Sequence, residues 1–174
     1  MNKQQNTLGR QQVNKWDIRY LGLAKHVASW SKDPSTQTGA VIMRPNKSVA
    51  SIGFNGFPVS MPDHEALYND REEKYSRIIH CEMNAMEFSG DVSHKGYTLY
   101  TWPFLSCDRC FVHMVQSGIT RFVAPMANED QLSRWGEAFE RVRGYGQECG
   151  VTIDEYKMSD IVNNPEFIMG LFKI

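Results

Sequence analysis

The sequence predicts an α/β fold of three layers, α-β-α, in which helices lie on both faces of a central mixed five-stranded sheet. Helical and strand-like segments alternate along the chain, and many are bounded by Gly, Pro, Asn or Asp residues that favour turns. The chain has 174 residues, which suits one domain with a sizeable core. Its 41% apolar and 22% charged residues are close to the average of globular proteins, so neither disulfides nor repeats are needed for folding.

The first expected elements are a helix and a β-hairpin. Apolar residues recur at three- and four-residue steps over 16–30, and Asp33-Pro34 is expected to stop this helix. Two apolar runs separated by a turn predict strands at 39–43 and 49–54. Residues 58–79 combine prolines with a charged and aromatic run that could be helical at 70–75. We interpret them as an insertion on the sheet framework.

The second half of the chain alternates three helices with three strands. Helix-like segments are 81–89, 108–117 and 131–149. Strand-like segments are 97–101, 121–124 and 151–153. The expected order is therefore α-β-β-α-β-α-β-α-β.

The two ends of the chain differ in character. Residues 1–14 are polar and rich in Gln and Asn, which predicts a flexible arm before a single domain over 15–174. The tail, 156–174, carries four apolar residues that we expect to dock on the domain or on a neighbouring subunit. These are Phe167, Ile168, Leu171 and Phe172.

Charge and hydropathy exclude several classes of function. The formal net charge is -1, with 19 Lys and Arg against 20 Asp and Glu, whereas proteins that neutralise many backbone phosphates usually carry a basic excess. This balance favours a small-molecule substrate over nucleic acid. The sequence contains no stretch of about 18 apolar residues, so no membrane span is predicted. The N-terminal residues also lack the apolar run of a signal peptide. The expected location is cytoplasmic.

Two short motifs carry the chemistry. His80 lies two residues before Glu82 at the start of one expected helix, and Cys107 and Cys110 lie at the start of the next one. The positive ends of two helices would meet at one spot and lower the pKa values of the thiols. One His and two Cys supply the three protein ligands of a catalytic zinc, which keeps its fourth position open for a water that the metal acidifies.

Glu82 distinguishes a catalytic site from a structural one. A carboxylate beside the metal could take a proton from that water and pass it to a ring nitrogen, as in zinc deaminases of nucleobases. A Cys-x-x-Cys pair alone is equally typical of structural or redox sites. A structural zinc would need a fourth ligand, but Cys81 should point away along its helix and Cys149 is more typical of a small buried hydrophobe. The sequence shows no second Cys/His cluster.

The resemblance extends beyond the metal motifs. In order and spacing, the chain resembles the deoxycytidylate (dCMP) deaminase family over roughly residues 15–155, in the stretches 31–40, 53–58, 80–85 and 116–119. This resemblance implies a cytidine deaminase-like fold and hydrolysis of dCMP to dUMP and ammonia, which supplies dUMP for thymidylate synthesis. It also implies a homo-oligomer, commonly a hexamer, that dCTP activates and dTTP inhibits, with Mg²⁺ accompanying the effector.

Site residues follow from the matching positions. The resemblance implies a Zn²⁺ site formed by His80, Cys107 and Cys110. It implies that Glu82 moves protons and that Asn55 contacts the nucleotide near its sugar and base. The 31–37 loop would lie near the substrate, with Lys32 and Thr36 as polar contacts.

Two residues inside the motifs depart from the family pattern. Cys81 replaces the usual Ala between the His and the Glu, which is tolerable if its side chain points into the core. Ser106 replaces the usual Pro before the first cysteine, which removes a rigid turn residue. We expect the protein to bind zinc despite both changes.

Two other functions remain open from the sequence. A nucleic-acid deaminase, acting on adenosine or cytosine of tRNA, shares the metal motif but would normally have a basic surface. A zinc-stabilised nucleotide-binding module without turnover would have no use for the carboxylate of Glu82.

Overall fold

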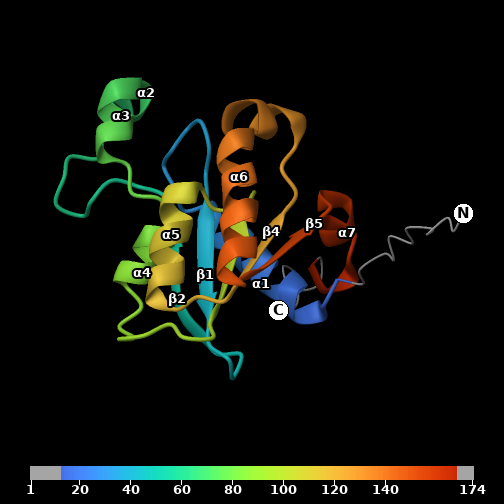
Figure 1. The fold of residues 1–174 in the computed structure, drawn as a ribbon. Helices are drawn as coiled ribbons and strands as arrows, with labels where there is room; N and C mark the ends of the chain where they lie inside the picture. The colour runs from blue at the N-terminus through green and yellow to red at the C-terminus, as the bar shows by residue number, and fades with distance from the viewer. Residues whose placement is uncertain (1–12, 168–174) are drawn as a thin grey trace, which may run out of the picture.

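The computed structural model describes residues 13–167 and shows the expected mixed sheet of five strands (Figure 1). They lie in the order β2-β1-β3-β4-β5. Their bounds are Gly39–Met43 (β1), Val49–Phe54 (β2), Thr98–Trp102 (β3), Arg121–Pro125 (β4) and Thr152–Tyr156 (β5). β1 pairs antiparallel with β2 and β3, whereas β3, β4 and β5 run parallel. The carboxyl ends of these three strands therefore meet at one edge, where ligands of α/β sheets commonly bind.

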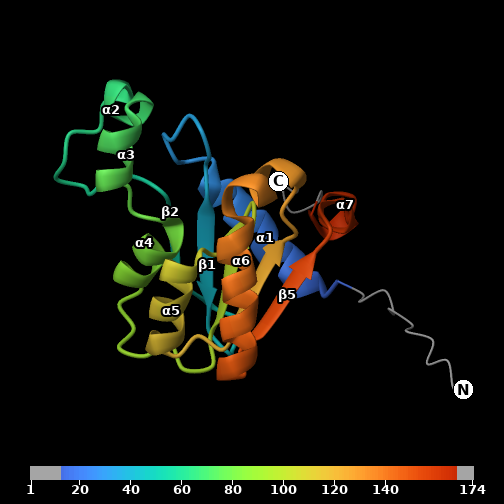
Figure 2. The ribbon, with the colours of Figure 1, turned by 45° about the horizontal axis from the view of Figure 1, so that its top comes forward.

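Helices cover both faces of the sheet, which confirms the three layers (Figures 1 and 2). The main helices are α1 (Lys15–Ala28), α4 (Cys81–Glu87), α5 (Asp108–Ser117) and α6 (Glu129–Cys149). α1 packs on one face in a buried cluster that includes Ile18, Leu21, Val41, Tyr100 and Val123. α4, α5 and α6 pack on the other face in a cluster that includes Ile42, Ala85, Phe111, Phe122 and Phe139. The sheet is thus buried on both sides, and the two clusters form its core.

The segment interpreted as an insertion holds two short helices (Figure 2). These are α2 (Glu65–Asn69) and α3 (Arg71–Arg77), where the sequence indicated one helix at 70–75. Asp70 starts α3 because its side chain accepts hydrogen bonds from the backbone N–H groups of Glu72 and Glu73, at 3.0 and 3.1 Å. The earlier helix α2 packs by the ring of Tyr68, which stacks on Phe57 with 4.2 Å between ring centroids.

The last strand is longer than the sequence indicated, because its polar residues find partners. The hydrophobic pattern predicted a strand only over 151–153, and β5 continues to Tyr156. In the structure Arg121 donates to Asp154 and Arg143 donates to Glu155, both at 2.8 Å, so these carboxylates stay within β5. A last short helix follows, α7 (Met158–Val162).

The ends of the described chain are anchored to the domain. Asn14 caps α1 by accepting a hydrogen bond from Trp16 N at 2.9 Å. Phe167 is buried and stacks on Trp102, with ring centroids 5.8 Å apart, in agreement with a docked tail. Residues 1–12 of the expected arm, and Ile168, Leu171 and Phe172, lie outside the described residues. Among residues 13–167 no helix is long and apolar enough to cross a membrane.

Candidate active site

Both metal motifs lie at helix starts on the same face of the sheet. His80 is the N-cap of α4, and Cys107 is the N-cap of α5. α4 lies very close to β2 because Gly53 has no side chain. A Cβ atom at that glycine would approach the carbonyl oxygen of Cys81 to 2.4 Å. A glycine in the strand therefore allows the helix start to reach its position beside α5.

His80, Cys107 and Cys110 form a compact donor cluster. The Nδ1 atom of His80 lies 3.5 Å from Sγ of Cys107 and 3.4 Å from Sγ of Cys110. All three donor atoms lie within 4.8 Å of one another, and no other such group of three occurs in the part of the chain that the structure describes. Tetrahedral zinc, with Zn–N and Zn–S bonds of about 2.0 and 2.3 Å, separates N and S ligands by about 3.6 Å. The donor atoms therefore fit zinc.

The electrostatics of this cluster favour a thiolate. A hydrogen bond from the Cys110 side chain and the adjacent His80 together lower the pKa of the Cys107 thiol to about 4. The hydrogen bond between His80 and Cys107 raises the pKa of His80 to about 9. The same Cys107–Cys110 hydrogen bond raises the pKa of Cys110. Thiolate is the form of cysteine that binds metal, so Cys107 is the donor that is already in its metal-binding form at neutral pH.

Glu82 faces the same space as the donor cluster. It lies in the first turn of α4 and is only 5% exposed. Together with His80 and Cys107 it lines a cavity of about 450 Å³. Cys81 is buried in the core cluster and is not part of the donor cluster, as the sequence indicated. Its Sγ is buried but lies 3.3 Å from Oε2 of Glu82, because both residues sit in the first helical turn.

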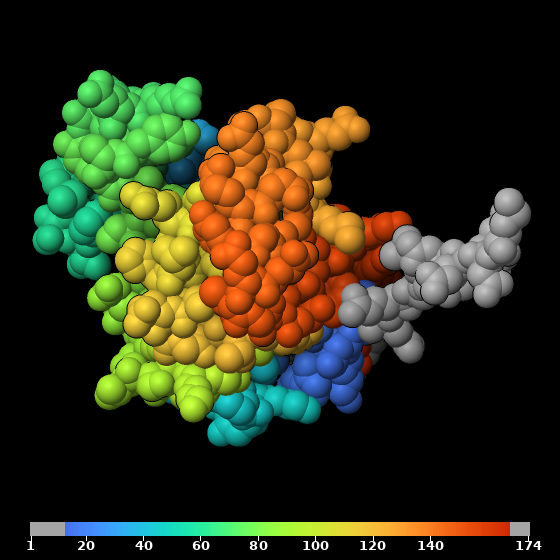
Figure 3. Space-filling view, viewed as in Figure 1, coloured from blue at the N-terminus to red at the C-terminus, as the bar shows by residue number. Residues whose placement is uncertain are grey.

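The cavity walls come from distant parts of the chain. Outside the insertion, four aromatic residues line it, namely Trp102, Phe104, Trp135 and Phe139. Tyr68, Arg71, Lys74 and Tyr75 of the insertion also line it, as does Arg134 of α6. In the space-filling view the surface is hollowed between the insertion and α6 (Figure 3). The cavity therefore joins a metal site at its floor to exposed charged and aromatic side chains at its edge.

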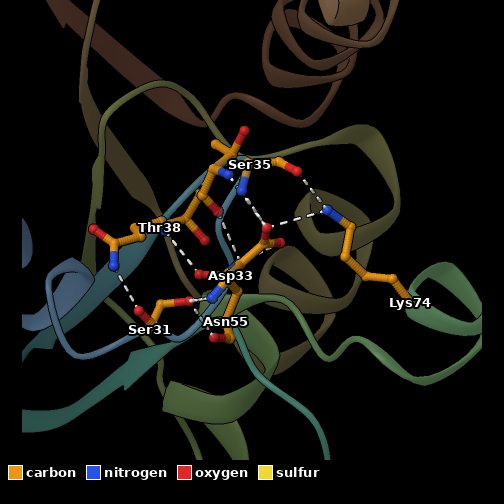
Figure 4. A network of polar contacts seen from close by, with 8 residues as sticks. Ser31, Asp33, Ser35, Thr38, Asn55 and Lys74 are labelled. Carbon is orange, nitrogen blue, oxygen red and sulfur yellow. Dashed lines mark hydrogen bonds and ion pairs between the residues drawn. The ribbon is translucent and has the colours of Figure 1, made fainter. Parts of the chain in front are cut away.

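Asn55 lies at the centre of a polar network that holds the 31–38 loop (Figure 4). Its Oδ1 accepts a hydrogen bond from Thr38 N at 2.8 Å, and its Nδ2 donates to Thr36 O at 3.0 Å. Nδ2 also lies 3.3 Å from Oδ2 of Asp33. Both amide hydrogens thus have protein partners. Asn55 lines the cavity, but its main observed role is to shape the loop.

Asp33 links this loop to the insertion. Its Oδ1 accepts from Nζ of Lys74 at 3.1 Å and from Ser35 N at 2.8 Å. Both members of the ion pair are buried, at 6% and 7% exposure, so each charge depends on the other. Lys74 also donates to Ser35 Oγ at 3.0 Å. The insertion is therefore fixed against the loop that lines the cavity.

The two other expected substrate contacts are placed differently. Thr36 lines the cavity. Lys32 does not line it, because its side chain is 67% exposed and its ammonium pairs with Asp63 at 2.5 Å. Proximity in the motif suggested a contact for Lys32, but the backbone turns its side chain away to solvent. The geometry gives this residue no direct contact with a ligand in the cavity.

The family model for the cytidine and deoxycytidylate deaminase zinc-binding region matches residues 14–126, a range that contains the whole donor cluster and Glu82. The chain belongs to the cytidine and deoxycytidylate deaminase family. It is therefore a zinc-binding deaminase.

Individual relatives of this deaminase agree with the family. The "Uncharacterized deaminase in luxG 3'region" of Aliivibrio fischeri is 38% identical over 141 residues, which cover 81% of this chain and 93% of that protein. The deoxycytidylate deaminase of Mus musculus is 30% identical over 113 residues, covering 62% of this chain and 63% of that enzyme. This chain thus spans less than two thirds of the mouse enzyme's length.

The fold of the deaminase also has a solved counterpart. The dCMP deaminase of cyanophage S-TIM5, in its apo form, superimposes with a TM-score of 0.63 at 18% identity. The match covers 83% of this chain and 99% of the phage protein. It confirms the cytidine deaminase-like fold that the sequence predicted.

Sequence reasoning missed several residues of the deaminase cavity. Trp102 and Phe104 line the cavity, whereas the neighbouring Leu105 is a core residue. Arg71 and Lys74 lie in a polar run whose pattern does not indicate a binding site, because only the folded insertion brings them over the cavity. Asp33 could have been noticed in the sequence, since Asp-Pro after a helix is typical of a structured turn.

One departure from the family pattern has a measurable consequence for stability. Ser106 is 1% exposed, and its Oγ has no hydrogen-bond partner within the described residues. Ser106→Ala removes an unsatisfied buried hydroxyl, so we expect the free energy of unfolding to rise by about 1–3 kcal/mol. Urea unfolding of the zinc-loaded deaminase measures this. Ser76→Ala, on the exposed insertion, is the control and should change stability by less than about 0.5 kcal/mol. A Ser106→Ala protein less stable than the parent would show that the Ser106 hydroxyl of the parent has a hydrogen-bond partner.

Proposed function

We propose that this deaminase hydrolyses dCMP to dUMP and ammonia. The observation that carries the proposal is a single cavity that joins the donor cluster and Glu82 to aromatic walls and exposed arginines. Relatives named deoxycytidylate deaminase support the same substrate. So does the cyanophage dCMP deaminase of the same fold, which has been solved in complex with dCMP and dUMP.

Metal binding and proton transfer are assigned to different residues. His80, Cys107 and Cys110 would hold zinc, which supplies a water acidic enough to attack C4 of cytosine at neutral pH. Glu82 takes the proton of this water and delivers it to the ring nitrogen N3. As the C4–N bond breaks, Glu82 takes the second proton of the former water from the new C4 hydroxyl and passes it to the leaving amine, so that C4 keeps a carbonyl oxygen. One water is consumed and one ammonia is released, and the enzyme returns to its starting state.

The aromatic walls suit a flat base. Trp135 and Phe104 lie with ring centroids 4.9 Å apart, and Phe104 and Phe139 lie 5.7 Å apart. Such a wall can stack on a pyrimidine and keep bulk water from the reacting carbon.

Two arginines at the cavity edge suit a phosphate. Arg71 forms no ion pair within the described residues, and its guanidinium lies 5.3 Å from the ring centre of Tyr75. Arg134 stacks on Trp135 at 4.2 Å and pairs with Asp130 on its own helix. Guanidinium groups bind phosphate by charge-assisted hydrogen bonds. The substrate is therefore expected to be a nucleotide and not a nucleoside.

The arginines give a substrate-specific prediction. Arg71→Gln and Arg134→Gln should each lower kcat/KM for dCMP by about 10- to 100-fold, the size of one charged hydrogen bond. The same changes should leave kcat/KM for deoxycytidine, which lacks the phosphate, within about twofold. Arg19→Gln is the control, since Arg19 lies on α1 and pairs with Glu166. Equal losses on both substrates would show that the arginines do not bind the phosphate.

The finer features of the proposal follow the family resemblance. They are a homo-oligomer, commonly a hexamer, activation by dCTP and inhibition by dTTP with Mg²⁺, and a cytoplasmic location. Initial rates against dCMP concentration, with and without each effector, test the regulation. Sigmoidal curves that dCTP makes hyperbolic support it, and curves unchanged by either nucleotide contradict it.

The substrate itself is tested by ammonia release. Purified zinc-loaded protein is incubated with dCMP, deoxycytidine or a tRNA hairpin, and the Glu82→Gln variant serves as the blank. We expect release from dCMP with the highest kcat/KM. Faster release from the hairpin would favour a nucleic-acid deaminase, and no release from any substrate would favour a binding module.

A further inference from the structure

Among residues 13–167, the carboxylate of Glu82 has one hydrogen-bond donor, the thiol of Cys81. Its side chain is 5% exposed, and the thiol of Cys81 lies 3.3 Å from Oε2. Within residues 13–167 no other hydrogen bond reaches this carboxylate. A buried carboxylate normally has several partners, so a single donor has a large share in fixing its position.

Cys81 is well placed to remain a donor. It is 2% exposed and packs in the core cluster that also contains Ala40 and Ala85. The family resemblance places Ala at this position, and an alanine has no donor to offer.

We infer that Cys81 is a positioning residue, whose S–H···O hydrogen bond holds the carboxylate of Glu82 in the orientation needed for proton transfer. The inference rests on the proposed function, because it assigns Glu82 the proton transfers. Glu82 has three rotatable side-chain bonds and lines a cavity of about 450 Å³, so its carboxylate has room for other rotamers. A donor on the preceding residue, in the same helical turn, selects one of them.

If Cys81 only packs in the core, the expected order of the Cys81→Ala and Cys81→Ser activities is reversed. A free cysteine in a core often acts only as a small hydrophobe. In that case Cys81→Ala, which restores the family residue, should be well tolerated, and Cys81→Ser should be worse because it buries a hydroxyl. If Cys81 positions Glu82, Cys81→Ala loses the donor and Cys81→Ser keeps it.

The kinetic test compares these two variants on dCMP. We expect Cys81→Ala to lower kcat by about three- to tenfold, the size of one weak hydrogen bond, with KM within about twofold. Cys81→Ser should recover most of kcat. Cys149→Ser, at the exposed end of α6, is the matched control and should behave as the parent. Parent-like kcat in Cys81→Ala, or a larger loss in Cys81→Ser, overturns the inference.

A spectroscopic test does not depend on turnover. In the zinc-loaded Cys149→Ser protein, Cys107 and Cys110 are thiolate ligands, so Cys81 is the remaining source of an infrared S–H stretching band. We expect this band below the frequency of a free thiol and expect Glu82→Gln, a weaker acceptor, to move it upward. A free-thiol band that Glu82→Gln leaves unchanged overturns the inference. If dCMP turnover is absent but the band shifts, the proposed function fails while the hydrogen bond stands.

Discussion

Glu82→Gln is expected to lower the turnover of dCMP by about 10²- to 10⁴-fold or more, while zinc stays bound. The amide has nearly the size of the carboxylate but cannot accept a proton. Proton transfers to N3 and to the leaving amine then lose their carrier. The donor cluster is untouched, because Glu82 is not part of it. Steady-state ammonia release and the zinc content of the purified variant measure the two effects separately.

A matched control lies on the same helix. Glu87 is exposed at the other end of α4, so Glu87→Gln should keep both turnover and zinc. A Glu82→Gln protein with full zinc and parent-like turnover would remove Glu82 from the mechanism. Loss of zinc in this variant would instead indicate that the carboxylate helps to hold the metal.

The donor cluster could be found from sequence because local rules position each part of it. Cys107 and Cys110 are three residues apart in the first turn of a helix, so their side chains share one face. His80 is the N-cap of another helix, and α4 and α5 pack on the same face of the sheet. The hairpin strands and α5 have the bounds that hydrophobic pattern and turn residues indicated.

The insertion and the cavity edge could not be found in this way. Lys74 lies in a polar run without apolar periodicity, so its burial was not expected from the sequence. It is buried because Asp33, 41 residues earlier, supplies the opposite charge. Lys32 shows the converse, since a motif position close to the site carries a side chain that turns to solvent. Contacts between distant segments depend on the tertiary fold, which local patterns do not encode.

Asp17 is the clearest example of such a contact, and it gives the largest expected effect on stability. The residue lies in the first turn of α1 and is 1% exposed. Its carboxylate accepts from Tyr100, Arg121 and Tyr156, all at 2.8 Å, which join α1 to β3, β4 and β5. Asp17→Asn keeps the size of the side chain but removes the charge that these donors face. We expect the free energy of unfolding to fall by about 3–5 kcal/mol, the cost of breaking a buried ion pair by one partner.

Urea unfolding at neutral pH measures this loss, and an exposed carboxylate supplies the control. Glu137 is 96% exposed and lies 3.8 Å from Arg141, so Glu137→Gln should change stability by less than about 1 kcal/mol. An Asp17→Asn protein as stable as the Glu137→Gln control would show that the network adds little to the fold.

The pH dependence of this difference tests its electrostatic origin. Burial alone would raise the pKa of Asp17, but hydrogen bonds from Arg121, Tyr156 and Tyr100 outweigh it and hold the pKa below 3.8. A carboxyl group with a lowered pKa in the folded state stabilises the protein above its unfolded pKa, about 3.9, and loses this contribution as pH falls through the folded value. The stability gap between the parent and Asp17→Asn should therefore be constant from about pH 5 to 7 and narrow below about pH 4. A gap that stays constant through pH 3 would mean that the loss arises from packing and not from the charge of Asp17.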